Sequence, residues 1–460
     1  MTFTIINFIK QLIDFEDDNE NIIITNFRVE NSHKIICVEY KNSKIYCPKC
    51  GTRMRVKEKY VRHIKHSILQ DGFQLIIEYT QRSWTCPSCK DRFTPNVHFV
   101  SKYKQFSNAT TYLSVIKLED LSLSVSSVAS SFGMSDTSLH NLFLQHIDMQ
   151  RLPLPEVLSI DEVYINMAED CKYALVLMDF MTHDIIDILP SRRETYTNQY
   201  FLDIPSEERK RVKYIISDMY EPYLAYINRY FYNASLAIDS FHVISWLINR
   251  INVYLRRLTN KYKDNKNSDE YYLLKNYKWL ILKNEENIQY IDTPDKMDRH
   301  FHRLMPTILY LKRLYKIDPN LENIKELKEA YISFNNAPYS SQEEISNELD
   351  KLINTYTNSN IDIFVEFAAL LKKHKDPILN SFVIMPSLGK SVRLSNGAME
   401  SFNRKPKDLK RLARGVVNFE FFRQRILFHE RTEKPFLNSA KPLEDIKVKT
   451  NKKRGKYNTK

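Results

Sequence analysis

Two adjacent carboxylates, Asp161 and Glu162, interrupt the short apolar stretch VLSIDEVYIN at residues 157–166. The stretch follows Pro153 and Pro155 and is rich in β-branched residues, which predicts a buried strand. A carboxylate inside a buried strand is costly unless it is paired or bound to a metal ion. An acid at the exposed end of the strand is the plainer interpretation, and this stretch alone does not decide between them.

Two further acids follow predicted strands. Asp218 comes directly after a predicted strand at 212–217, and Asp239 directly after another at 235–238, with His242 three residues later. Carboxylates are the hard oxygen ligands that Mg²⁺ requires, and a pair of such ions can drive phosphodiester chemistry.

Glu400 lies in the first turns of a predicted helix that begins at Asn396. Helical spacing places Asn396, Glu400, Asn403 and Lys407 on one face, although Pro406 must kink this helix or start a new one. Basic residues crowd the acid: Arg404, Lys405, Lys407, Lys410, Arg411 and Arg414. Glu400 is either their counter-charge or a catalytic acid, and the residues alone leave both interpretations open.

Four cysteines form two CxxC pairs: Cys47, Cys50, Cys86 and Cys89. Two such pairs supply four thiolates for a tetrahedral Zn²⁺, and Gly51 suits the tight turn after the first pair. The 35 residues between the pairs must be structured, and Asp71 with Gly72 predicts a hairpin turn there. Unrelated surface cysteines and a redox CxxC are the alternatives.

Residues 125–139 have the pattern of a helix, a turn at Gly133, and a second helix that Ser135 caps. This is the arrangement of a helix-turn-helix, whose second helix reads DNA bases near its start. The candidate DNA contacts are Thr137, Ser138, His140 and Asn141. Any two helices joined by a glycine turn look similar, so the pattern gains weight only beside the zinc module on a basic chain.

The residue pattern in the middle of the chain predicts three strands, a helix, a strand, a helix and a strand, in that order. The segments are 157–166, 173–180, 184–189, 197–202, 212–217, 223–231 and 235–238. This is the order of an RNase-H-like sheet, in which the first strand and the end of the fourth each carry an acid. Amphipathic helices at 246–250, 307–315, 321–331 and 361–373 then predict a helical insertion. The insertion either supports the fold or contacts DNA.

Composition and charge limit the classes of binding partner and of function that the chain can have. The formal net charge is +12 over 460 residues, which fits a polyanion, either nucleic acid or a membrane surface. The seven glycines cannot form GxGxxG or GxxxxGK[ST], which argues against nucleotide-driven functions. No signal peptide or membrane span is expected, so we expect a cytoplasmic, nucleoid-associated protein with reduced cysteines and no membrane partner.

Several motifs in this order resemble the ISL3 family of bacterial insertion-sequence transposases. They are YCPKCG, TCPSC, the helix-turn-helix, SIDEVYI, YALVLMDF, YIISDMYEPY, AIDSFH and NGAMESFNRKPKDLKRLARGVVNF. The resemblance implies an α/β protein with an RNase-H-like catalytic domain and a triad of acids. Carried over position by position, the triad is Asp161, Asp218 and Glu400, with Glu162 left as a supporting or DNA-facing acid.

The same resemblance implies two Mg²⁺ or Mn²⁺ ions on the triad and a structural Zn²⁺ on the four cysteines. Asp239 and His242 resemble the C/D-x-x-H signature of related transposases, and with Asn403 they are expected to be structural or DNA-contacting. The implied partners are double-stranded DNA, both the terminal inverted repeats and the target, and a second copy in a homodimer or higher multimer. The basic residues Arg404, Lys405, Lys407, Lys410 and Arg411 are expected to contact DNA.

The implied function is transposition by metal-dependent strand cleavage and strand transfer. The alternatives are an inactive or repurposed DNA-binding protein and an RNase-H-like nuclease. The predicted domains are 1–100 (zinc-binding), 101–152 (helix-turn-helix), 153–245 and 386–432 (catalytic), 246–385 (helical insertion) and 433–460 (basic tail).

Overall fold

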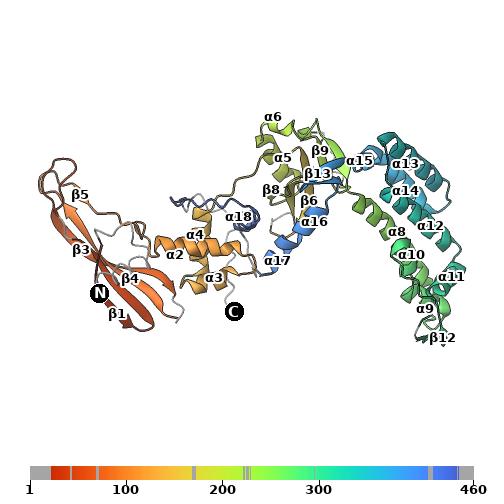
Figure 1. Cartoon of the computed structure of the whole chain (residues 1–460), viewed down its shortest axis with the longest axis horizontal. Helices are drawn as coiled ribbons and strands as arrows, with labels where there is room; N and C mark the ends of the chain where they lie inside the picture. Colours follow the sequence, from red (N-terminus) through yellow and green to blue (C-terminus); the bar gives the residue numbers. More distant parts are fainter. Residues whose placement is uncertain are drawn as a thin grey trace, which may run out of the picture. The chain divides into compact units, whose positions relative to one another are not determined.

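The computed structural model describes residues 22–41, 44–68, 72–167, 172–220, 223, 227, 229–294, 296–412, 418–442 and 444. The chain divides into two compact units, whose elements are labelled in Figure 1. Unit one is Met1–Gln150 with Lys405–Lys460, and unit two is Arg151–Arg404. The six predicted domains are finer than this division and stay predictions, although residues 405–432 group with unit one and not with residues 386–404.

Unit one contains a five-stranded sheet in the order β1-β2-β4-β3, with β5 paired to β4. Its strands are β1 (Ile22–Glu30), β2 (His33–Tyr40), β3 (Arg55–Ile68), β4 (Gln74–Thr85) and β5 (Arg92–Phe93). Alternate residues of β4, including Leu75, Ile77 and Tyr79, are buried in the core of this sheet, as the two-residue period of a strand requires. Strands β3 and β4 pair antiparallel, while Asp71 of the predicted turn lies outside the described residues.

The helical part of unit one contains the predicted helix, glycine turn and second helix. Its helices are α2 (Asn108–Ile116), η2 (Lys117–Glu119), α3 (Val125–Ser131), α4 (Asp136–His146) and α18 (Phe419–Glu430). Gly133 has a φ of +64°, a conformation that glycine adopts without strain. Ser135 caps α4 by accepting a hydrogen bond of 3.2 Å from the Ser138 amide. The predicted turn and cap are therefore confirmed.

Helix α18 joins the helices of unit one through a buried arginine. The Arg425 side chain is 1% exposed, and its guanidinium donates to the carbonyl oxygens of Leu118, Asp120 and Leu123 at 2.6–2.9 Å. These carbonyls lie at the end of η2 and in the loop before α3, where helical partners are missing. Burial lowers the pKa of this guanidinium to about 10, and the three carbonyls compensate for the lost hydration.

Unit two is built on a five-stranded sheet in the order β10-β9-β6-β7-β8. Its strands are β6 (Val157–Tyr164), β7 (Tyr173–Asp179), β8 (Ile185–Leu189), β9 (Tyr214–Ser217) and β10 (Ser235–Ile238). Strands β6, β7 and β8 form an antiparallel meander, whereas β9 pairs parallel to β6 and β10 parallel to β9. All five predicted strands are confirmed in position.

Successive side chains of β6 point to opposite sides of the sheet and belong to two different hydrophobic clusters of unit two. Leu158 and Ile160 belong to a large core shared with the helices, while Val157 packs with Leu394 on the other side of the sheet. Two short strands, β13 (Ile384–Ser387) and β14 (Lys390–Arg393), form an antiparallel hairpin. Leu394, which packs with Val157, directly follows this hairpin. The hairpin leads directly into α16 (Gly397–Phe402), which carries Glu400.

The rest of unit two is mostly helical, and Figure 1 shows α9 to α14 stacked as one array. The helices are α5 (Glu194–Asp203), α6 (Ser206–Arg209), α8 (Ser240–Lys261), α9 (Asp269–Asn276), α10 (Trp279–Leu282), η3 (Glu285–Asn287), α11 (Thr307–Ile317), α12 (Asn320–Asn336), α13 (Gln342–Thr357), α14 (Asp362–Lys373) and α15 (Lys375–Asn380); a two-stranded ribbon pairs β11 (Met297–Asp298) with β12 (Arg303–Leu304). The helices predicted between 246 and 373 are confirmed.

The helix predicted at 223–231 lies largely outside the described residues, as does the tail from 447. Among the residues that the structure does describe, no helix combines the length and apolar character that a membrane crossing requires.

Candidate functional site

Asp161 lies on the side of β6 that faces the Glu400 helix. Its Oδ2 accepts a hydrogen bond of 2.7 Å from Nδ2 of Asn403, and its Oδ1 accepts one of 2.7 Å from the Glu162 amide. Burial raises the pKa of the Asp161 carboxyl to about 6, and the negative charges of Asp218 and Glu162 add to the rise. The carboxylate is thus fixed in orientation but held in surroundings that disfavour its charge.

Glu162 points to the other side of the strand and is neutralised there. Its Oε1 accepts a 2.5 Å hydrogen bond from the Tyr223 hydroxyl, and its Oε2 forms an ion pair with Arg192. The Arg192 guanidinium also lies over the rings of Tyr173 and Tyr220, at 4.9 and 4.2 Å. Glu162 therefore has a structural set of partners that Asp161 lacks.

Asp218 follows the last residue of β9, next in the sheet to β6. Its Oδ1 accepts a 2.9 Å hydrogen bond from the Tyr220 amide. Burial raises the pKa of this carboxyl, and repulsion from Glu162 contributes, while the fields of His242 and Arg192 oppose the rise. Asp161 and Asp218 also repel one another, which is the electrostatic condition that a divalent cation relieves.

Glu400 is exposed on α16, and it lies near the start of α8. The ligand atoms of Glu400, Asp239 and His242 lie within 4.8 Å of one another, a spacing at which one cation could bind all three. Asp161 and Asp218 are outside that grouping, although His242 acts electrostatically on both of them. His242 is therefore close to Glu400 and also within electrostatic range of Asp161 and Asp218.

Both carboxylate oxygens of Asp239 already have partners. Oδ1 accepts from the Phe241 amide at 3.0 Å, which caps α8, and Oδ2 accepts from the Asn396 amide at 2.9 Å. Asp239 is 3% exposed. Its contacts are those of an anchor between α8 and the residue that begins α16.

The expected Glu400 helix is divided into two. Helix α16 ends at Phe402, Asn403 follows, and α17 (Arg404–Leu412) begins next, with Pro406 in its first turn. Proline is tolerated there because the first amides of a helix have no intrahelical partner. Of the two expectations for Pro406, a kink or a new helix, the structure has a new helix, which begins two residues earlier at Arg404. Lys407 consequently lies on a separate helix, and the face shared with Glu400 ends at Asn403.

The basic residues after Glu400 have varied surroundings within unit one. Lys405 pairs with Glu430 at 2.9 Å, and Arg411 with Asp408 at 3.3 Å. Their exposure leaves both cations accessible to a polyanion, since exposed ion pairs are weak.

The four CxxC cysteines come together at one end of the unit-one sheet. The Sγ–Sγ distances are 3.5 Å for Cys47–Cys89, 3.4 Å for Cys50–Cys86 and 3.6 Å for Cys50–Cys89. Four thiolates at about 2.3 Å from one Zn²⁺ would lie about 3.8 Å apart, far beyond disulfide length, so the cluster is compatible with structural zinc.

The turns that follow the two cysteine pairs are alike. The Gly51 amide donates to the Cys47 carbonyl at 2.9 Å, and the Lys90 amide to the Cys86 carbonyl at 3.0 Å. Gly51 and Lys90 both have positive φ, +68° and +61°. The glycine expected to suit this turn therefore does so in the first pair, while a lysine adopts the same conformation in the second.

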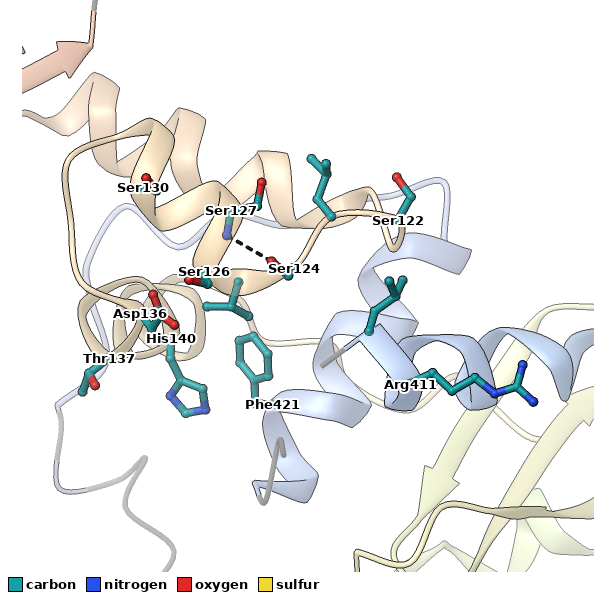
Figure 2. A pocket seen from close by; sticks show the side chains of 13 residues that line it. Ser122, Ser124, Ser126, Ser127, Ser130, Asp136, Thr137, His140, Arg411 and Phe421 are labelled. Carbon is teal, nitrogen blue, oxygen red and sulfur yellow. Dashed lines mark hydrogen bonds between the residues drawn. The ribbon is translucent and has the colours of Figure 1, made fainter. Parts of the chain in front are cut away.

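The second helix of the glycine-turn pair borders a groove of about 1110 Å³ in unit one, shown in Figure 2. Thr137, His140 and Arg411 line it together with a row of serines from the loop before α3 and from α3 itself. Two sets of predicted DNA contacts, one on α4 and one on α17, thus share one groove. Ser138 and Asn141 are half-buried and do not line it.

His140 is less available than expected. Its ring stacks on Phe421 of α18 at a centroid distance of 4.4 Å, and burial lowers its pKa. The ring packs against α18 while its edge reaches the groove (Figure 2).

Comparison with known proteins identifies the family. Residues 158–426, more than half of the chain, match the model of the ISL3-type DDE transposases. The chain belongs to the ISL3 transposase family. The matched region includes Asp161, Asp218 and Glu400 and excludes the cysteine cluster.

A curated relative agrees with this family assignment. The chain is 22% identical over 254 residues to the transposase for insertion sequence element IS1001 of Bordetella parapertussis. The alignment covers 53% of this chain and 59% of that relative, so the chain spans less than two thirds of the relative's length.

Three contributors to the site were not predicted from the sequence: Tyr223, Arg192 and Asn396. The signal for the first two was the second acid of the pair, because a buried glutamate needs its own partners. The predicted helix begins at Asn396, yet Asn396 makes no side-chain cap bond, and its side chain donates to the Ile160 carbonyl instead.

Proposed function

We propose that this protein is a DNA transposase that binds the ends of an insertion sequence and catalyses strand cleavage and strand transfer with Asp161, Asp218 and Glu400. The observation that carries the proposal is the position of Asp161 on β6 and of Asp218 directly after the neighbouring β9, inside the region that matches the family. His242 acts electrostatically on both aspartates and has a ligand atom within 4.8 Å of one from Glu400. The name of the Bordetella relative, an insertion-sequence transposase, supports the same function.

The unit-two sheet is proposed to be RNase-H-like. Its order, with an antiparallel meander β6-β7-β8 and with β9 and β10 added parallel beside β6, supports this assignment. The first strand carries Asp161, and Asp218 follows the fourth.

The donor set fits divalent metal ions. Asp161, Asp218 and Glu400 offer hard carboxylate oxygens, and burial leaves the first two with raised pKa values that a cation would lower. Mg²⁺ or Mn²⁺ ions bound there would activate the attacking water or 3′-hydroxyl and stabilise the leaving oxygen. Asn403 orients Asp161, and Asp239 anchors the start of the Glu400 helix.

DNA binding is proposed for unit one. The glycine-turn helix pair would act as a helix-turn-helix, and the groove lined by Thr137, His140 and Arg411 would face the duplex. The four-cysteine cluster would hold a structural Zn²⁺ that fixes the sheet end. A homodimer or higher multimer on DNA would hold two element ends together.

The test is an in vitro reaction of the full-length protein with end-sequence DNA and Mg²⁺ or Mn²⁺. Cleaved ends and joined products are expected, while Asp161→Asn, Asp218→Asn and Glu400→Gln should abolish both and leave end binding nearly intact. Strand transfer retained by one of these variants would remove that residue from the triad. End binding without any cleavage would favour a repurposed DNA-binding protein, and cleavage without end preference or joining would favour a nuclease.

A further inference from the structure

We propose that Asn396 and Asn403 are positioning residues that hold the Glu400 helix against the Asp161 strand so that the acids can share divalent metal ions. The inference rests on the proposed function, because it takes Asp161 and Glu400 as metal ligands. It assigns both side chains a role that acts through Asp161 and Glu400.

Asn396 connects three segments of unit two at the start of α16. Its Nδ2 donates to the carbonyl of Ile160, the residue before Asp161, at 3.2 Å. Its backbone amide donates to Asp239 at 2.9 Å, and its carbonyl accepts the Glu400 amide at 2.9 Å. One residue therefore joins strand β6, the start of α8 and the peptide of Glu400.

Asn403 makes the matching contact at the other end of α16. Its backbone amide donates to the Met399 carbonyl at 2.9 Å, which fixes it to the end of the helix. Its Nδ2 donates to Asp161 Oδ2 at 2.7 Å. Because the Glu162 amide holds Oδ1, the Asp161 carboxylate cannot rotate without losing a hydrogen bond.

The spacing explains why both asparagines meet β6. Residues four before and three after Glu400 lie on the same side of a helix. That side faces the strand, and it carries the two amides at 1% and 5% exposure. Glu400 lies between them and remains exposed.

Burial of these amides has a cost that packing alone does not explain. The Oδ1 atoms of Asn396 and Asn403 are both buried without a hydrogen-bond partner among the described residues. Apolar side chains of similar size would fill the same space without leaving acceptors unsatisfied. The donors of these amides, each directed at the Asp161 segment, are what such substitutions would lose.

The test compares Asn403→Ala and Asn396→Ala with Ser401→Ala, which changes an exposed residue of the same helix. Mn²⁺ binding to the full-length protein on end DNA is titrated by electron paramagnetic resonance, and end affinity is measured by gel shift. Loss of outer contacts to metal ligands commonly weakens metal binding about 10- to 100-fold. We expect that weakening in both asparagine variants, with end affinity within about twofold of wild type. Ser401→Ala should match wild type in both measurements.

A rescue experiment separates positioning from ligation and from a merely structural role. Raised Mn²⁺ should restore cleavage to Asn403→Ala but not to Asp161→Asn, because only the second has lost a ligand. Wild-type Mn²⁺ affinity in Asn403→Ala would overturn the inference. Should Asn396→Ala fail to fold, Asn403→Ala and the milder Asn403→Ser decide the outcome.

Failure of the proposed function has a different result. If Asp161→Asn binds Mn²⁺ as wild type does, the proposed triad is wrong. If Asp161→Asn loses Mn²⁺ while both asparagine variants retain it, the triad stands and only the positioning role is wrong.

Discussion

At the scale of single residues, the neighbouring acids of β6 have opposite electrostatic surroundings. Glu162 is surrounded by donors, with the Tyr223 hydroxyl and the Arg192 guanidinium on its two oxygens. Asp161 has an amide on each oxygen and no ion pair among the described residues. An ionised carboxylate without a cationic partner in such a position destabilises the fold, an arrangement that is common at functional sites.

Asp161→Asn should stabilise the metal-free protein while abolishing cleavage. The raised pKa of Asp161, about 6, means that its ionisation disfavours the folded state as pH rises from about 4 to 6. At pH 7.5 without added Mg²⁺, we expect a gain of about 1–2 kcal/mol in the free energy of unfolding. Urea denaturation measures it, with exposed Asp203→Asn as the control. A variant less stable than wild type would contradict this electrostatic explanation.

Glu162→Gln should have the opposite effect on stability. It removes the charge that neutralises Arg192, and the two side chains are only 11% and 26% exposed. We expect a loss of about 1–3 kcal/mol, measured by urea denaturation. The control Glu156→Gln removes a more exposed pair with Lys213, where little change is expected. Equal effects in the two variants would argue against a structural role for Glu162.

The sequence shows that Asp161 and Glu162 are adjacent acids in a predicted strand. Its periodicity does not show which of the two faces the site. Both sides of the predicted strand are largely apolar, so alternation showed only that the two acids face opposite ways. The choice of Asp161 came from the family resemblance. The partners of Glu162 come from residues 30 and 61 positions later, and contacts at that separation depend on the folded sheet.

At the scale of elements, α4 is held by aromatic contacts that depend on pH. His140 stacks on Phe421, and His146 stacks on Phe436 at 4.7 Å and donates from Nδ1 to the Leu437 carbonyl. Burial lowers the pKa of both imidazoles, and the field of Lys104 lowers that of His146 further. Both rings therefore pack in the neutral form.

Acidification should weaken the packing of α4 on the C-terminal segments. Because the folded pKa values are depressed, this stability is present above the unfolded value of about 6.5 and is lost as pH falls below it. We expect faster amide exchange in α4 and α18 at pH 5.5 than at pH 7.5, after correction for intrinsic rates. In His140→Phe the change should be smaller. An unchanged pH response in that variant would exclude His140 as a source.

The paired cysteines are the second element-scale feature with a direct test. Cys86 is buried beside Trp84 and Cys47, so the cluster also forms a small core. Cys86→Ser should release zinc, measured by atomic absorption, and weaken end binding, whereas Cys37→Ser in the same sheet should retain zinc. Unchanged zinc content in Cys86→Ser would exclude a four-thiolate site.

The positions of strands and helices were easier to predict from the sequence than the contacts between them. Strands and amphipathic helices follow local period, so β6 to β10 and the insertion helices α8, α11, α12 and α14 were predicted from the sequence, whereas α9, α10, α13 and α15 were not. The break between α16 and α17 was signalled by Pro406. The Asp239–Asn396 contact spans 157 positions, and no local pattern predicts it.

At the scale of the whole molecule, the net charge of +12 predicts salt-sensitive binding to DNA. The logarithm of the association constant should fall linearly with the logarithm of salt concentration. If Arg411 in the unit-one groove contacts a phosphate, Arg411→Ala should reduce the slope by about 1. Lys351→Ala, which removes a cation of α13 in unit two, is the control. An unchanged slope in Arg411→Ala would remove this residue from the interface.

The buried Arg425 also has a consequence for synthesis on the ribosome. The carbonyls that accept its hydrogen bonds lie near residue 120. About 300 further residues must therefore be synthesised before Arg425 can donate to the loop before α3. All of unit two emerges in that interval, between the two parts of unit one. A polypeptide released early would thus carry Asp161 and Asp218 without a finished unit one. If unit one binds the element's ends, as proposed, the order of translation would itself keep fragments of the protein from occupying those ends.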